Sequence, residues 1–194
     1  MQPEELVKVL AAAAKPVRRL SSPMVRLLIW LGVSVAYAAL VVWLMGVRPD
    51  LPSKLADTRF AVELAATFMT SVLAAAAAFC AGCPGRPIWE RFAPLPALGL
   101  WFWSLGEGCW RTFAASGAEG LSFRLDFVCL PSILLVSVVP GALMLKMIRQ
   151  GAPIAPIATT ALAALAAVSA ALVGCAAIRL PEVALDPAMG PSAP

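Results

Sequence analysis

The sequence predicts an all-α membrane protein, a polytopic bundle of about five transmembrane helices behind a short N-terminal helix. Of the 194 residues, 61% are hydrophobic and 13% are charged, whereas soluble domains are about 45–50% apolar and about 25% charged. A mean hydropathy of +0.86 also excludes a disordered chain, because disorder requires low hydrophobicity. Five stretches with few charges approach the length of about 20 residues that crosses a bilayer core.

The first two predicted spans, residues 27–47 and 64–83, are each bounded by charged residues. Trp30 and Trp43 stand near the two ends of the first span, where tryptophan anchors a helix at the membrane interface. The second span is rich in alanine, and small residues let helix backbones approach closely in lipid. These small residues recur four apart, at Thr70, Ala74, Ala78 and Gly82.

The third predicted span, residues 92–110, is the most polar. Its uncharged part, residues 92–106, is too short to cross a bilayer unaided. We therefore expect Glu107 to lie near an interface. Pro94 and Pro96 fit the first turn of the helix, because the backbone donors that proline lacks are unbonded there.

The fourth and fifth predicted spans are residues 127–145 and 154–178. Pro140 is expected to kink the fourth span. Small residues recur every four positions along two faces of the fifth span, which predicts that this helix packs on two sides. They are Ala163, Ala167, Ala171 and Cys175 on one face and Ala166, Ala170 and Gly174 on the other.

The distribution of basic residues predicts the orientation, because cytoplasmic segments carry an excess of lysine and arginine. One side holds Lys8, Lys15, Arg18, Arg19, Arg26, Arg86, Arg91, Lys146 and Arg149. The other side holds Arg48, Lys54, Arg59, Arg111, Arg124 and Arg179, together with most of the acidic residues. We therefore expect a cytoplasmic N-terminus and a C-terminal tail, residues 179–194, outside. The tail is rich in proline, alanine and glycine without periodicity, and a disordered segment is expected.

The N-terminal segment, residues 1–26, combines a predicted amphipathic helix over residues 3–14 with a basic connector over residues 17–23. The apolar positions of the helix are Leu6, Val9, Leu10 and Ala13. Two interpretations stay open. The connector could hold anionic headgroups while the helix lies on the bilayer, or the helix could enter a groove on a cytoplasmic partner.

The five cysteines fall into two groups in this topology. Cys80 and Cys83 form a C-x-x-C pair at the cytoplasmic end of the second span, where we expect packing cysteines rather than a redox or metal site. Cys109, Cys129 and Cys175 all fall near the outer face. Three thiols at one depth could form a disulfide with a spare thiol, could bind a soft metal ion, or could be buried packing residues.

The absence of histidine excludes a Ser-His-Asp triad, a histidine metal site and bis-histidine haem ligation. We expect no enzyme and no cofactor. The net charge of +4 arises largely from the predicted inner face, so it does not indicate direct binding of nucleic acid. A membrane thiol redox protein or soft-metal carrier using Cys80 and Cys83 is the alternative, and a scaffold subunit without a sensing role is a third possibility.

Several segments resemble the NrsF family, negative regulators of an extracytoplasmic-function sigma factor, over about residues 5–175. The most specific are Pro16-Val17-Arg18-Arg19-Leu20 and Gly46-Val47-Arg48-Pro49-Asp50-Leu51. Others are Asp57-Thr58-Arg59-Phe60, Ser104-Leu105-Gly106-Glu107-Gly108-Cys109 and Arg149-Gln150-Gly151-Ala152-Pro153.

The resemblance implies an integral anti-sigma factor of the bacterial inner membrane. Such a protein holds its sigma factor at the cytoplasmic face until an outside signal, here a thiol, metal or oxidative stress, releases it. The resemblance implies a sensing role for Cys129 and Cys175, and Cys109, which falls near the same face, is the third candidate sensing thiol. The implied sigma-binding residues are Leu6, Leu10, Pro16, Arg18, Arg19 and Leu20. Members of the family usually have six spans, so five spans predict a periplasmic C-terminus and a weakened response to the signal.

Overall fold

The computed structural model describes residues 21–83, 85–117, 129–151 and 155–178, together with Glu5, Val7 and Ala12. Most of the predicted N-terminal helix and all of the predicted tail lie outside the described residues. The predicted sigma-binding residues lie outside them as well: Leu6, Leu10, Pro16, Arg18, Arg19 and Leu20.

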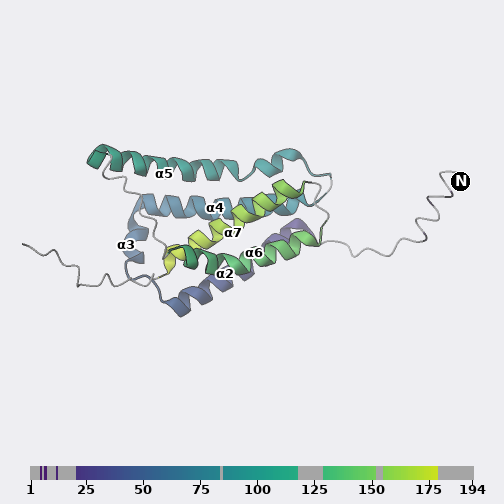
Figure 1. The fold of residues 1–194 in the computed structure, drawn as a ribbon, viewed down its shortest axis with the longest axis horizontal. Coiled ribbons are helices and arrows are strands. Elements are labelled where there is room, and N and C mark those ends of the chain that lie inside the picture. Colours follow the sequence, from purple (N-terminus) through teal and green to yellow (C-terminus); the bar gives the residue numbers. More distant parts are fainter. Residues whose placement is uncertain are drawn as a thin grey trace, which may run out of the picture.

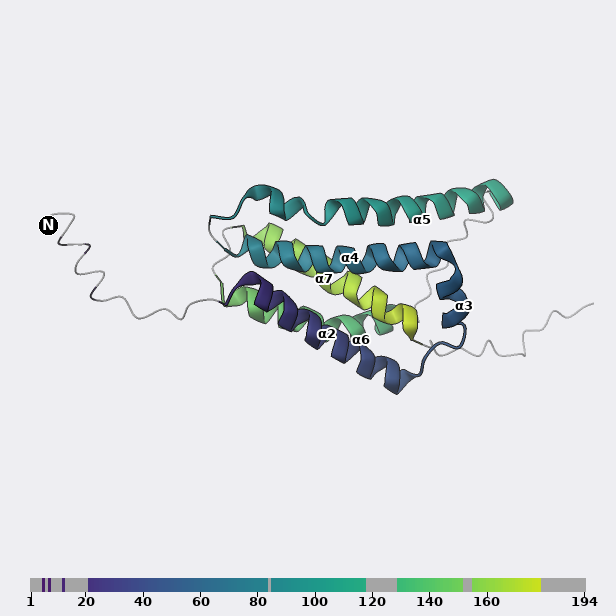
Figure 2. The same ribbon diagram turned by 180° about the vertical axis from the view of Figure 1, so that it is seen from behind.

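The described residues form six α-helices and one 3-10 turn, arranged side by side as a bundle (Figures 1 and 2). No strand occurs within them, so the prediction of an all-α fold is confirmed. The elements are α2 (Pro23–Met45), α3 (Leu51–Ala56), α4 (Thr58–Ala81), η1 (Ile88–Phe92), α5 (Leu95–Ser116), α6 (Cys129–Arg149) and α7 (Pro156–Ala177).

Hydrogen bonds between helices fix their relative directions. The Trp30 indole on α2 donates to the carbonyl oxygen of Pro140 at 3.0 Å. Further along α2, the Tyr37 hydroxyl donates to the carbonyl of Leu135 at 2.9 Å. The residue number on α6 decreases from 140 to 135 as that on α2 increases from 30 to 37, so the two helices are antiparallel. A bridge between Val47 and Ile178 joins the ends of α2 and α7, which are therefore parallel.

The core is built where α4 meets α7, the pair of helices in most extensive contact. Small side chains permit this close approach, because alanine fills little space between two backbones. The Ser71 hydroxyl on α4 donates to the carbonyl of Ala166 on α7 at 2.9 Å. The predicted packing of the last helix on two sides is confirmed, since α7 also packs on α6. A Cβ added at Gly174 would lie only 3.0 Å from a methyl carbon of Val136.

Four helices are long and apolar enough to cross a membrane, namely α2, α4, the Leu130–Arg149 part of α6, and α7. They correspond to the first, second, fourth and fifth predicted spans and indicate a multi-pass membrane protein. The third predicted span forms α5, a helix of 22 residues, but α5 is not among these four. Glu107 and Arg111 lie within α5 and make it more polar than the other four, so four of the five predicted spans are matched by long apolar helices.

Four helices extend beyond the spans that charge-free runs predict. α2 begins at Pro23 rather than at residue 27, and α6 continues to Arg149 rather than ending at residue 145. α4 begins at Thr58 rather than at residue 64, and α5 continues to Ser116 rather than ending at residue 110. In α4 and α5 an acid and a base four residues apart pair on one helix face, within the extension of α4 and across the predicted end of the third span in α5. The pairs are Arg59 with Glu63 and Arg111 with Glu107. A charge that has its partner one turn away is compatible with a helix near the membrane interface.

Candidate functional site

Each end of the bundle contains charged, polar or thiol side chains that could bind a ligand or react. The inner end, named for the orientation that the sequence predicts, comprises the start of α2, the end of α4, η1 and the end of α6. The outer end comprises the end of α2, α3, the start of α4, the end of α5, the start of α6 and the end of α7. Figure 1 shows α3 lying across the outer end.

A buried arginine ties three helices together at the inner end. Arg26, on the first turn of α2, is 4% exposed. Its guanidinium donates a hydrogen bond to the carbonyl of Met147 on α6. It also lies 4.9 Å from the centre of the Phe79 ring on α4, within range of a cation–π interaction. Arg26 therefore joins the start of α2 to the ends of α4 and α6.

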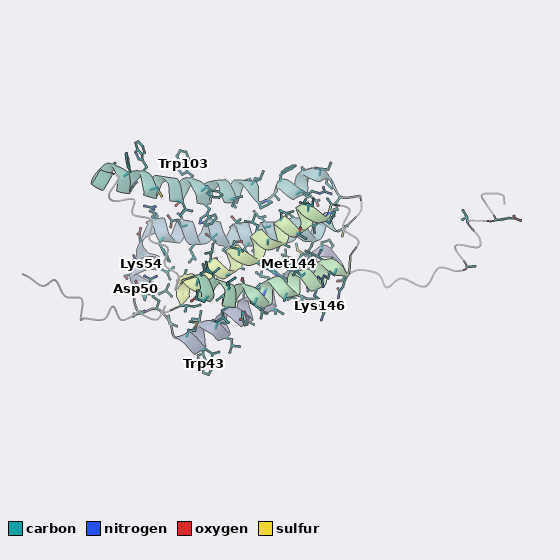
Figure 3. All side chains as sticks on the ribbon, viewed as in Figure 1. Trp43, Asp50, Lys54, Trp103, Met144 and Lys146 are labelled. Atoms are coloured by element: carbon teal, nitrogen blue, oxygen red, sulfur yellow. The ribbon has the colours of Figure 1, made fainter. Side chains whose placement is uncertain are left out.

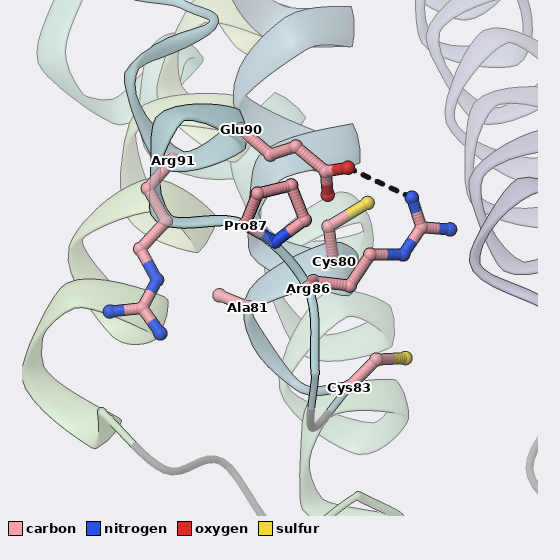
Figure 4. A pocket seen from close by; sticks show the side chains of 7 residues that line it. All are labelled: Cys80, Ala81, Cys83, Arg86, Pro87, Glu90 and Arg91. Atoms are coloured by element: carbon pink, nitrogen blue, oxygen red, sulfur yellow. Dashed lines mark hydrogen bonds and ion pairs between the residues drawn. The ribbon is translucent and has the colours of Figure 1, made fainter.

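The C-x-x-C pair lies at the same end. The amide of Cys83 donates to the carbonyl of Cys80 at 3.0 Å, which closes a turn after α4. Arg86 donates to Glu90 at 3.0 Å above the Cys80 thiol (Figure 4), and this bond raises the pKa of the Arg86 guanidinium.

These side chains surround a pocket of only about 10 Å³, space for about one water molecule. Among the residues that the structure describes, no three cysteine or acidic side chains are grouped to hold a metal ion. Nothing here favours the carrier alternative that uses Cys80 and Cys83, and the structure is compatible with packing cysteines.

The three predicted sensing thiols belong to helices whose nearby ends lie at the outer end. Cys109 is exposed on α5, Cys175 is half-buried in the last turn of α7, and Cys129 begins α6. α5 packs on α4. The three positions therefore share an end of the bundle but lie on three different helices, and the side chain of Cys129 is outside the described residues.

A polar clamp that the sequence did not predict joins α4 to α5 near the outer end. It consists of Arg59 and Glu63 on α4 and Ser104 and Gly108 on α5. Arg59 Nε and the Ser104 hydroxyl both donate to Glu63 Oε1, at 3.0 and 2.9 Å. Arg59 Nη2 also donates to the carbonyl of Ser104 at 3.2 Å. The guanidinium lies so close to Gly108 that a Cβ there would overlap it.

In the sequence, Glu63 stands directly before the second predicted span, and no pattern there pairs it with the third. The signal that could have identified the clamp is the pair Arg59 and Glu63, four residues apart at the start of a helix, with a helical glycine across from it. Such a glycine makes room for a bulky neighbour where two helices approach.

The chain matches a known protein family over most of its length. A family described as NrsF, Negative regulator of sigma F, matches residues 10–183. No curated protein and no solved structure matches the chain.

Proposed function

The chain belongs to the NrsF family, negative regulators of sigma F, and from this we propose that it holds an extracytoplasmic-function sigma factor at the cytoplasmic face of the inner membrane. Negative regulation of a sigma factor follows from the family. The location of the bound sigma factor, the signal and the release step are parts of the proposal.

We assign α5 as a fifth crossing of the membrane. Both α4 and α6 are antiparallel to α2, since Arg26 at the start of α2 contacts Phe79 and Met147 at the far ends of α4 and α6. The chain therefore leaves α4 at the inner end and enters α6 at the outer end. The connection has to run the length of the bundle, and α5, with 22 residues, is about 33 Å long at 1.5 Å per residue.

The distribution of charge supports a cytoplasmic inner end. Among the described residues, the inner end carries five basic residues and one acid, namely Arg26, Arg86, Arg91, Lys146, Arg149 and Glu90. The outer end carries four basic residues and four acids, namely Arg48, Lys54, Arg59, Arg111, Asp50, Asp57, Glu63 and Glu107. Positive charge is retained on the cytoplasmic side of membrane proteins. This orientation puts the N-terminus in the cytoplasm, where a sigma factor works, and the C-terminus in the periplasm.

The sigma-binding segment in this proposal is the amphipathic helix and basic connector, with Leu6, Leu10, Pro16, Arg18, Arg19 and Leu20. The observation that supports it is the position of Arg26. The helix that follows the segment begins at Pro23, and Arg26 fastens its first turn to α4 and α6. A rearrangement of these helices would move the position at which the segment joins α2. This movement would couple the bundle to the bound partner.

The test is affinity purification of the tagged protein from native membranes in mild detergent, with mass spectrometry of the proteins that accompany it. We expect an extracytoplasmic-function sigma factor with the full chain and none after deletion of residues 2–20. Deletion of residues 181–194, at the other terminus, is the matched control and should leave recovery unchanged. Recovery that persists without residues 2–20 would contradict the assignment of the segment.

The signal in this proposal acts through the thiols Cys109, Cys129 and Cys175. Cys129→Ser should alter induction of sigma-dependent transcription by oxidant or a soft metal and leave repression in resting cells intact. Cys80→Ser, at the other end of the bundle, is the matched control and should respond like the wild type. An unchanged induction curve in Cys129→Ser would reject a role for this thiol.

A further inference from the structure

A cleft of about 160 Å³ lies between α5 and α7 on the surface of α4, near the outer end. α5 and α7 each pack on α4, and the contact between α5 and α7 is much smaller than either. The cleft is lined by Phe60, Glu63 and Thr67 of α4, Trp101 of α5, and Val173 and Ala176 of α7. With α5 as a crossing helix, the cleft lies between membrane helices and opens toward lipid.

The polarity of the cleft changes with depth. Its charged lining residue is Glu63, about one turn into α4, with the apolar Phe60 further out. Arg59, the ion-pair partner of Glu63, lies beside the cleft and is not part of its lining. Thr67 lies one turn deeper than Glu63, and the walls from α5 and α7 are apolar and aromatic. From Phe60 to Thr67 the helix rises about 10 Å. A ligand that matches this gradient has a charged head and an apolar chain.

The ion pair between Arg59 and Glu63 indicates which lipid headgroup the cleft would bind. The Arg59 and Glu63 side chains are 41% and 24% exposed, so both can meet a ligand. Glu63 Oε1 accepts from Arg59 and from Ser104, and Oε2 takes part in neither bond. A cation beside a carboxylate complements a headgroup with a phosphate beside an ammonium. A primary ammonium can donate three hydrogen bonds, whereas the quaternary ammonium of choline donates none.

We propose that this cleft binds a phospholipid with a phosphoethanolamine headgroup from the outer leaflet. The phosphate meets Arg59, the ammonium meets Glu63, and one acyl chain lies between α5 and α7. This site rests on the crossing by α5 and the orientation proposed above, but it does not depend on binding of a sigma factor, so it can be tested with the purified protein alone.

Trp101 lines the cleft and reports its occupancy. Trp103, two residues further on, is 76% exposed and points away from the bundle (Figure 3). The test uses variants that keep only one of these tryptophans, in nanodiscs of phosphatidylcholine. Phosphatidylethanolamine or phosphatidylcholine with a brominated acyl chain is added in steps, and quenching of fluorescence is measured.

We expect Trp101 to reach half-maximal quenching at about a three- to tenfold lower mole fraction of the ethanolamine lipid, the factor that one added hydrogen bond supplies. Trp103 should be quenched equally by both lipids. Ala176→Leu, which fills the cleft from α7, should abolish the preference seen at Trp101. Ala161→Leu, on an exposed position of the same helix, should retain it.

Equal quenching of Trp101 by the two lipids would overturn the proposal, and so would a preference that survives Ala176→Leu. If the single-tryptophan variants do not fold, native mass spectrometry of the otherwise unchanged protein gives the same comparison. Retention of the ethanolamine lipid by the wild type and by Ala161→Leu, and its loss in Ala176→Leu, supports the site. A protein dimer that Ala176→Leu dissociates would instead assign the cleft to a second copy of the chain.

Discussion

Gly108→Ala tests the clamp between α4 and α5 most directly. The added methyl group would overlap the Arg59 guanidinium. Since the guanidinium is the free end of a flexible side chain, we expect it to swing aside rather than the helices to separate. The cost is then the loss of its hydrogen bonds to Glu63 and to the carbonyl of Ser104.

The magnitude follows from the exposure of these groups. The Arg59–Glu63 pair is partly exposed, with side chains 41% and 24% accessible, so its loss costs at most about 1 kcal/mol. The hydrogen bond from the guanidinium to the Ser104 carbonyl contributes about 1.5 kcal/mol. Alanine in place of a helical glycine stabilises the helix by up to about 1 kcal/mol, which offsets part of this loss. We therefore expect Gly108→Ala to lower the free energy of unfolding by about 1–2 kcal/mol.

Gly106 provides the matched control, because it lies in the same helix and a Cβ there meets no atom within 4 Å. Gly106→Ala should be neutral or stabilising by up to about 1 kcal/mol. The assay is unfolding of the purified protein by SDS in mixed micelles, followed by circular dichroism at the helix band. Equal midpoints for the two variants would refute the reasoning that Arg59 depends on the absence of a side chain at 108.

Three further outcomes are expected from the same unfolding assay. Arg26→Gln should lower stability by about 2 kcal/mol, because it removes a buried charged hydrogen bond, whereas Arg86→Gln, half exposed, should change it by less than about 0.5 kcal/mol. Ser71→Ala should cost about 1 kcal/mol through its lost bond to α7. Arg48 holds the pKa of Asp50 below its ordinary value. The stabilisation lost in Asp50→Asn should therefore be constant from about pH 8 to 5, begin to fall near pH 4, the ordinary pKa of aspartate, and vanish only below the lowered pKa of Asp50 in the folded protein.

The sequence by itself determined that the chain is helical and membrane-embedded. Runs of apolar residues near 20 in length have no other stable arrangement in lipid, because each backbone donor and acceptor has to be satisfied within its own helix. The repeat of alanine every four residues also predicted which helix packs on two sides. The boundaries set by Glu63 and Arg111 could not be read correctly, since a charge ends an apolar run but does not end a helix.

Only the tertiary structure decided which of these helices touch and through which side chains. Arg26 stands in the sequence as a flanking charge, and its burial depends on Phe79 and Met147, residues far along the chain. The clamp also depends on residues distant in the sequence. The lack of a side chain at Gly108 matters only because the guanidinium of Arg59 lies against it. Local periodicity fixes the face of a helix, but the partner of that face is set by packing among segments distant in sequence.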